Sequence, residues 1–99
     1  MSDLHLSSKI ESTPGVAGGQ PRVADTRFTV KQIAVWHEFM GMSADEIATE
    51  YNLSLADIYA ALSYFFDHRT EIMEAIKVEE DLVNQMKKRF PSKIAAAHA

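Results

Sequence analysis

The 99-residue sequence contains no cysteine, only three prolines and only four glycines. Without cysteine the chain has no disulfide framework and no thiolate chemistry. Because proline and glycine are scarce and 46% of the residues are hydrophobic, we predict an ordered, mainly helical chain. No apolar run is long enough to cross a bilayer, and the N-terminus lacks the basic region and apolar stretch of a secretory signal. We therefore predict a cytoplasmic protein that does not bind membranes.

The net charge of −4 is distributed unevenly along the chain. Residues 1–42 hold four basic and four acidic side chains, whereas residues 43–67 hold five acidic side chains and no Lys or Arg. Residues 68–99 hold six basic and five acidic side chains. Affinity for DNA depends largely on cations that neutralise phosphates. The acidic middle segment by itself is therefore predicted to bind DNA weakly.

Residues 43–66 have the pattern of two helices joined by a tight corner. Ser43 stands three residues before Glu46, and Ser54 three before Asp57, which is the spacing of a capping box at each helix start. Asn52 suits the corner because it tolerates left-handed backbone. The first helix of the pair has one apolar face, formed by Ala44, Ile47, Ala48 and Tyr51. The arrangement predicts a helix-turn-helix unit.

The segment before this unit predicts a short β-ribbon and one more helix. Residues 9–13 are predicted to be extended, and residues 22–23 and 27–30 to form two strands around Asp25, which suits a positive-φ position. Thr29 is a predicted N-cap for a helix that ends near Gly41.

The segment after the unit predicts a last helix, which Thr70 caps and Pro91 stops. We therefore predict a mainly α fold: a three-helix core with a short N-terminal β-ribbon and an additional C-terminal helix. The predicted boundaries are a flexible N-terminus over residues 1–8, a ribbon plus helix-turn-helix domain over 9–69, the C-terminal helix over 70–91 and a flexible tail over 92–99.

Catalytic, metal and cofactor sites are not predicted. The four histidines show none of the HxxxH or HExxH spacings that place metal ligands on one helix face. No glycine-rich loop precedes a helix as a phosphate-binding loop requires. His37 is predicted to be a packed or surface residue, and His68 to cap or join the last two helices. We predict that the protein is not an enzyme.

Two sets of residues are predicted to make functional contacts. A helix-turn-helix unit suggests DNA binding through its second helix, but that helix, residues 55–67, offers no cation. Phosphate contacts are therefore predicted for Arg22, Arg27 and Lys31, and groove contacts for Ser54 and Tyr59. The alternative for the two arginines is a solvated or acid-paired hairpin edge.

The predicted last helix carries an apolar stripe in near 4-3-4-3 spacing that Glu79 interrupts. Such a stripe covers either the helical core, a sister chain or a groove on another protein. The residues predicted to contact a partner are Ile72, Ile76, Val83, Met86 and Phe90.

Several blocks of the sequence also resemble a known family. Residues 18–30 read GGQPRVADTRFTV, and this resembles the signature GGxPxIxGTRxxV of the bacterial family known as domain of unknown function 433. Residues 41–47, 53–64 and 67–69 look like its later blocks, so the resemblance covers roughly residues 10–76. Asp25 stands where the family usually has Gly and Asn52 where it usually has Pro, and both replacements suit corners.

The resemblance implies a homeodomain-like helix-turn-helix core and a VapB-type antitoxin. In that interpretation the protein neutralises a PIN-like ribonuclease toxin and represses its own operon by binding operator DNA. A chain this short buries a limited core, so we also predict a homodimer. The alternative function is a dimeric protein–protein interaction module that does not bind DNA.

Overall fold

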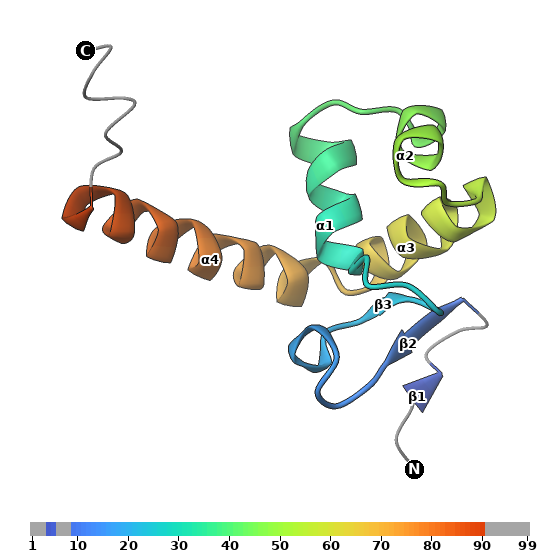
Figure 1. Ribbon diagram of the computed structural model, residues 1–99, viewed down its shortest axis with the longest axis horizontal. Helices are drawn as coiled ribbons and strands as arrows, with labels where there is room; N and C mark the ends of the chain where they lie inside the picture. The colour runs from blue at the N-terminus through green and yellow to red at the C-terminus, as the bar shows by residue number, and fades with distance from the viewer. Residues whose placement is uncertain (1–3, 6–8, 91–99) are drawn as a thin grey trace. The chain divides into compact units, whose positions relative to one another are not determined.

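The computed structural model describes residues 4–5 and 9–90 and is mainly helical (Figure 1). The chain divides into two units, residues 1–69 and residues 70–99. The first unit contains β1 (Leu4–His5), β2 (Ile10–Ser12), the 3-10 turn η1 (Ala17–Gly19), β3 (Arg22–Val23), α1 (Val30–Ala34), the π-helical segment η2 (Val35–Phe39), α2 (Ala44–Tyr51) and α3 (Leu55–Asp67). α4 (Arg69–Arg89) begins at the last residue of the first unit and forms the described part of the second.

The sheet has three antiparallel strands in the order β1-β2-β3, which differs from the predicted ribbon. β3 pairs with β2, with Val23 opposite Ile10, whereas residues 27–30 contribute one isolated bridge, between Thr29 and Arg22. The Val23 N–H also donates to the Phe28 carbonyl at 2.9 Å, so the predicted ribbon is formed in part. It is shorter than predicted because Thr29 caps α1: its side chain accepts a hydrogen bond from the Gln32 backbone, so the helix begins at Val30.

Part of the N-terminus predicted to be flexible is a strand instead. Leu4 and His5 form β1 and pair with Ser12 and Glu11 of β2. Residues 1–3 and 6–8 of the same predicted segment lie outside the described residues.

The helix starts and corners follow the predicted local signals. Capping boxes form at Ser43 and at Ser54, and the backbone is left-handed at Asp25, Gly41 and Asn52, with φ of 61°, 72° and 54°. Each of these signals depends on hydrogen bonds or sterics within a few residues, so the sequence carries it directly. The predicted first helix is continued by η2, whose π-helical form the sequence pattern does not indicate.

The core of the first unit lies where α3 meets the other elements. α1 and α2 both contact α3, and β2 and β3 contact it as well (Figure 1). The largest fully buried side chains are Phe65, Ile10, Ile33, Ile47, Ile58, Val23 and Val30. The sheet therefore completes the helical core, which agrees with the expectation that a small ribbon is marginal unless it packs on helices.

The junction before α4 differs in one respect from the prediction. α4 begins at Arg69, so Thr70 lies inside the helix and does not cap it. His68 ends α3, and its backbone N–H donates to the carbonyls of Tyr64 and Phe65, which confirms its predicted capping role. Pro91 and the predicted tail, residues 92–99, lie outside the described residues.

Within residues 4–5 and 9–90, no helix is both long and apolar enough to span a bilayer.

Candidate nucleic-acid and partner interfaces

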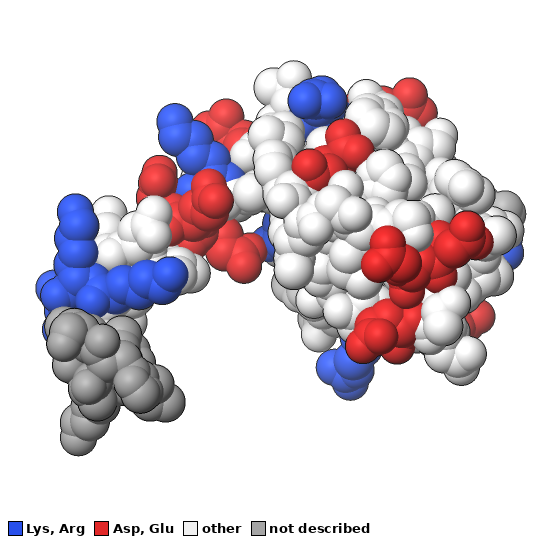
Figure 2. Space-filling view, turned by 90° about the horizontal axis from the view of Figure 1, so that it is seen from above, with Lys and Arg blue, Asp and Glu red and all other residues white. Residues whose placement is uncertain are grey.

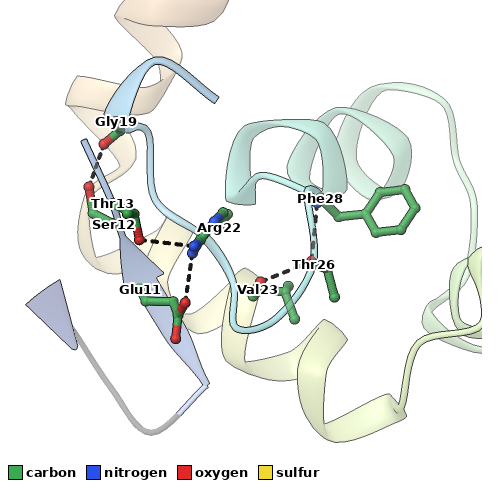
Figure 3. Close-up of polar contacts among 8 residues, drawn as sticks. All are labelled: Glu11, Ser12, Thr13, Gly19, Arg22, Val23, Thr26 and Phe28. Atoms are coloured by element: carbon green, nitrogen blue, oxygen red, sulfur yellow. Dashed lines mark hydrogen bonds and ion pairs between the residues drawn. The ribbon is translucent and has the colours of Figure 1, made fainter. Parts of the chain in front are cut away.

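Arg22 is a buried structural residue, not an exposed cation. Its Nη1 lies 2.9 Å from Glu11 Oε2, and its Nη2 donates to Thr13 Oγ1 at 2.9 Å (Figure 3). The pair is a cross-strand contact, because Glu11 of β2 stands opposite Arg22 of β3. A phosphate contact would require the guanidinium to leave a buried carboxylate, so the predicted DNA-binding role of Arg22 does not fit the structure. The acid-paired alternative is the one observed.

One sequence signal could have identified this pair. Ile10-Glu11 and Arg22-Val23 have mirrored order, so antiparallel pairing matches apolar with apolar and acid with base. Because residues 27–30 follow β3 closely, they are the neighbour that the sequence favours, and the pairing of β3 with β2 is not predicted.

Arg27 is exposed on the corner that joins β3 to α1. Thr26 fixes this corner: its hydroxyl donates to the Val23 carbonyl at 2.9 Å and accepts from the Phe28 N–H at 3.1 Å (Figure 3). Lys31, in the first turn of α1, is half-buried. Arg27 is therefore an exposed side chain on a hydrogen-bonded turn, and the phosphate contact predicted for it is sterically possible.

An aromatic cluster that no sequence pattern predicts supports the same corner. Trp36 stacks on Tyr51 with ring centroids 4.0 Å apart and an angle of 6° between the rings. Phe28 meets both rings, at 5.9 Å and 5.4 Å. The cluster links the corner to η2 and α2. No local pattern announces it, because the three residues lie far apart in the sequence.

The exposed side of α3 is apolar and not cationic. Tyr59 is 59% exposed and Leu55 42% exposed. The buried face of α3 is formed by Ile58, Ala61, Leu62 and Phe65. Ser54 is exposed, and its hydroxyl accepts from the Asp57 N–H at 3.0 Å, which leaves its own O–H as a donor. Such a face suits contact with a protein or with sugar and base edges better than with phosphates.

Both capping acids have carboxyl pKa values below their ordinary range. The Ser43 N–H donates to Glu46 Oε1 at 3.0 Å, and this bond, helped by the Ser43 side chain, lowers the pKa of Glu46. Burial raises the pKa of Asp57, but hydrogen bonds from Ser54 and the charge of Lys9, whose Nζ lies 3.5 Å from Asp57 Oδ1, outweigh burial and lower it. Both acids therefore stabilise their helices in the charged form.

A pH-dependent stability is expected at Asp57. A carboxyl whose pKa is lowered by folding contributes stability above its unfolded pKa, and the contribution is lost as the pH falls through the folded value. The free energy of unfolding lost in Asp57→Asn should therefore be largest near neutral pH and shrink below about pH 4. Urea titrations across this range measure the difference. The assignment is contradicted if the loss of stability in Asp57→Asn is independent of pH. It is also contradicted if Asp57→Asn causes an equal loss in a chain that already carries Ser54→Ala.

α4 carries the second candidate interface. Every residue from Lys77 to Phe90 is exposed. Of the residues predicted to contact a partner, Ile72 is buried and Ile76 half-buried, whereas Val83, Met86 and Phe90 are 45%, 45% and 65% exposed. Val78 and Leu82 are also exposed, at 62% and 57%. The C-terminal half of α4 is therefore the part of the predicted stripe that is free to contact another molecule.

Among the described residues, no group of three or more His, Asp or Glu side chains is arranged to hold a metal ion. His37 contacts the neighbouring Glu38, with Nδ1 2.7 Å from Oε2. His68 contacts the Tyr64 carbonyl through Nδ1 at 3.0 Å and stacks on the Tyr64 ring. Both histidines thus have local partners.

Comparison with known proteins shows which family this chain is related to. Residues 10–65, more than half of its length, match the family described as protein of unknown function DUF433. The chain belongs to the DUF433 family. A solved structure, that of a DUF433 member protein from Anabaena variabilis ATCC 29413, is similar, with 32% sequence identity, a TM-score of 0.66 and coverage of 73% of this chain and 71% of that chain. No curated protein matches the sequence.

The match confirms the predicted resemblance to the DUF433 family, while the antitoxin role that the resemblance implied stays a prediction. The family match ends at Phe65, and α4 begins at Arg69. The interface on α4 therefore has to be interpreted from its own residues.

Proposed function

We propose that this DUF433 protein is an antitoxin of a type II toxin–antitoxin pair and has no catalytic activity of its own. In this proposal α4 binds and neutralises a PIN-like ribonuclease toxin, and the domain of residues 9–69 represses the operon by binding operator DNA as a dimer. The observation that carries the proposal is the division of the chain into a packed domain and a separate helix with exposed apolar side chains.

The toxin-binding part depends on the apolar side of α4. A helix that exposes large apolar residues at helical spacing can lay them into a groove on another protein. The exposed members of the predicted set, Val83, Met86 and Phe90, belong to this side. Their exposure in the chain alone supports a role in contact with a second molecule.

Co-purification with the product of the neighbouring gene tests this part. Val83→Asp should abolish capture of that protein, because it places a charge in the apolar contact. Lys77→Asp is the matched control, since Lys77 is also exposed on α4 and receives the same new residue. Equal capture by both variants, or no capture by the wild-type chain, would count against toxin binding by α4.

The DNA-binding part depends on fewer cations than the sequence suggested. With Arg22 paired to Glu11, the proposed phosphate contacts are Arg27 and Lys31, with Ser54 and Tyr59 near the groove. Removing a phosphate contact lowers the dependence of affinity on salt by about 0.9 for each contact. The Arg27→Ala/Lys31→Ala variant should therefore bind a promoter fragment with a salt slope smaller by about 2 per copy. A wild-type salt slope near zero removes the DNA-binding part.

A second candidate function is an interaction module that never contacts DNA. It is favoured by the burial of Arg22 and by the five acidic side chains of residues 43–67, which include no Lys or Arg. In Figure 2, which looks onto the side where α1 and α2 lie in Figure 1, Asp and Glu form the larger charged patches of the domain. Capture of the neighbouring protein without promoter binding at low salt would support this candidate.

A further inference from the structure

α4 has an apolar ridge whose four residues stand four positions apart. Val78, Leu82, Met86 and Phe90 are 62%, 57%, 45% and 65% exposed. Residues four apart lie above one another on one side of an α-helix, so the four side chains form a continuous ridge. Ridges of this kind are the surfaces through which two helices interdigitate.

The charged residues around the ridge are arranged symmetrically about residue 84. Three acidic residues, Glu79, Glu80 and Asp81, precede that point, and three basic residues, Lys87, Lys88 and Arg89, follow it. Each block is three to five positions from residue 84, and the ridge residues are two and six positions from it. Figure 2 shows Lys and Arg gathered at the far end of α4, with Asp and Glu before them.

This symmetry indicates that the molecule packed against the ridge is a second copy of α4. An antiparallel copy of α4 centred on residue 84 places Val78 against Phe90 and Leu82 against Met86 of the other copy. It also places each acidic block beside the basic block of the other copy. A parallel copy would instead align acid with acid and base with base, which is repulsive. The surface is self-complementary in the way that a two-fold dimer interface requires.

We propose that α4 pairs antiparallel with α4 of a second copy, through the ridge of Val78, Leu82, Met86 and Phe90. The pairing concerns the free protein and so goes beyond the proposed function. Met86 and Phe90 also belong to the predicted toxin contact, so a toxin bound on this side of α4 would open the pair. Because the charged blocks are exposed, the pair weakens as salt screens them.

Sedimentation equilibrium of the purified full chain, without DNA or toxin, tests the pairing and its direction. The wild-type chain should form a dimer of its 11.1 kDa subunit. Glu79→Lys/Glu80→Lys/Asp81→Lys should dissociate it, because basic blocks then face each other. Adding Lys87→Glu/Lys88→Glu/Arg89→Glu to that variant exchanges the two blocks and should restore the dimer. The exchanged chain should not form mixed dimers with the wild-type chain, because an antiparallel mixed pair places like charges together, whereas a parallel mixed pair would place opposite charges together and be favoured. Circular dichroism confirms that each variant retains its helix content.

A second comparison tests the ridge itself. Leu82→Glu should weaken the dimer more than about tenfold, because it removes a buried leucine and introduces a charge. Asn84→Glu introduces the same residue on the opposite side of α4 and should leave the dissociation constant unchanged. A wild-type chain that stays monomeric overturns the proposal, as does a dimer that Leu82→Glu and the acidic-block variant leave intact. Since neither toxin nor DNA is present, these outcomes are independent of the antitoxin proposal.

Discussion

Arg22→Met is expected to destabilise the domain by about 3–5 kcal/mol, because it leaves the Glu11 carboxylate buried without its partner. Both side chains are nearly inaccessible, at 9% and 10% exposure, and their charged atoms are 2.9 Å apart. Arg27→Met removes an equal charge five residues away from an exposed position and should change the free energy of unfolding by less than about 0.5 kcal/mol. Urea denaturation followed by the fluorescence of Trp36, the single tryptophan of the chain, measures both.

A double variant keeps this test informative if Arg22→Met unfolds the protein. A small domain has a total stability of about 5–15 kcal/mol, so the single change is a large fraction of it. Glu11→Leu/Arg22→Met removes both charges together and should recover most of the loss, because no unpaired charge stays buried. If Arg22→Met is no less stable than Arg27→Met, the Glu11–Arg22 pair does not stabilise the sheet.

Phe65→Ala is expected to cost about 3–5 kcal/mol, since it removes a large side chain from the centre of the core. Phe65 is 1% exposed, and it lies on the face of α3 that α1, α2 and the sheet cover. The Arg69 guanidinium also lies 5.8 Å from the centre of its ring. The cavity left by truncation costs stability because the surrounding packed side chains relax only partly into it.

Phe66→Ala is the matched control for this prediction. Phe66 is the next residue along α3 and is 50% exposed. It meets Phe65 edge-on at 5.1 Å, so its loss should cost only about 0.5–1.5 kcal/mol. Thermal and urea unfolding of both variants provide the comparison. Similar losses in the free energy of unfolding for Phe65→Ala and Phe66→Ala would contradict the assignment of Phe65 to the buried face of α3.

The local features of this protein were determined by its sequence. The capping boxes at Ser43 and Ser54, and the left-handed corner at Asn52, depend on contacts within three or four residues. The bounds of α3 were therefore predictable, as was the apolar stripe of α4, because helical periodicity is a local property. The same holds for the charge blocks on either side of residue 84.

Only the tertiary structure decided which distant segments meet. β3 pairs with β2 in addition to its bridge to Thr29, and this pairing with a distant segment makes Arg22, predicted to contact phosphate, a buried partner of Glu11. The packing of α1 and α2 on α3 likewise decided that Leu55 is exposed and Phe65 buried. Strand pairing and the choice of buried face depend on the neighbours that compete for the same surface, and a periodic pattern in one segment does not identify those neighbours.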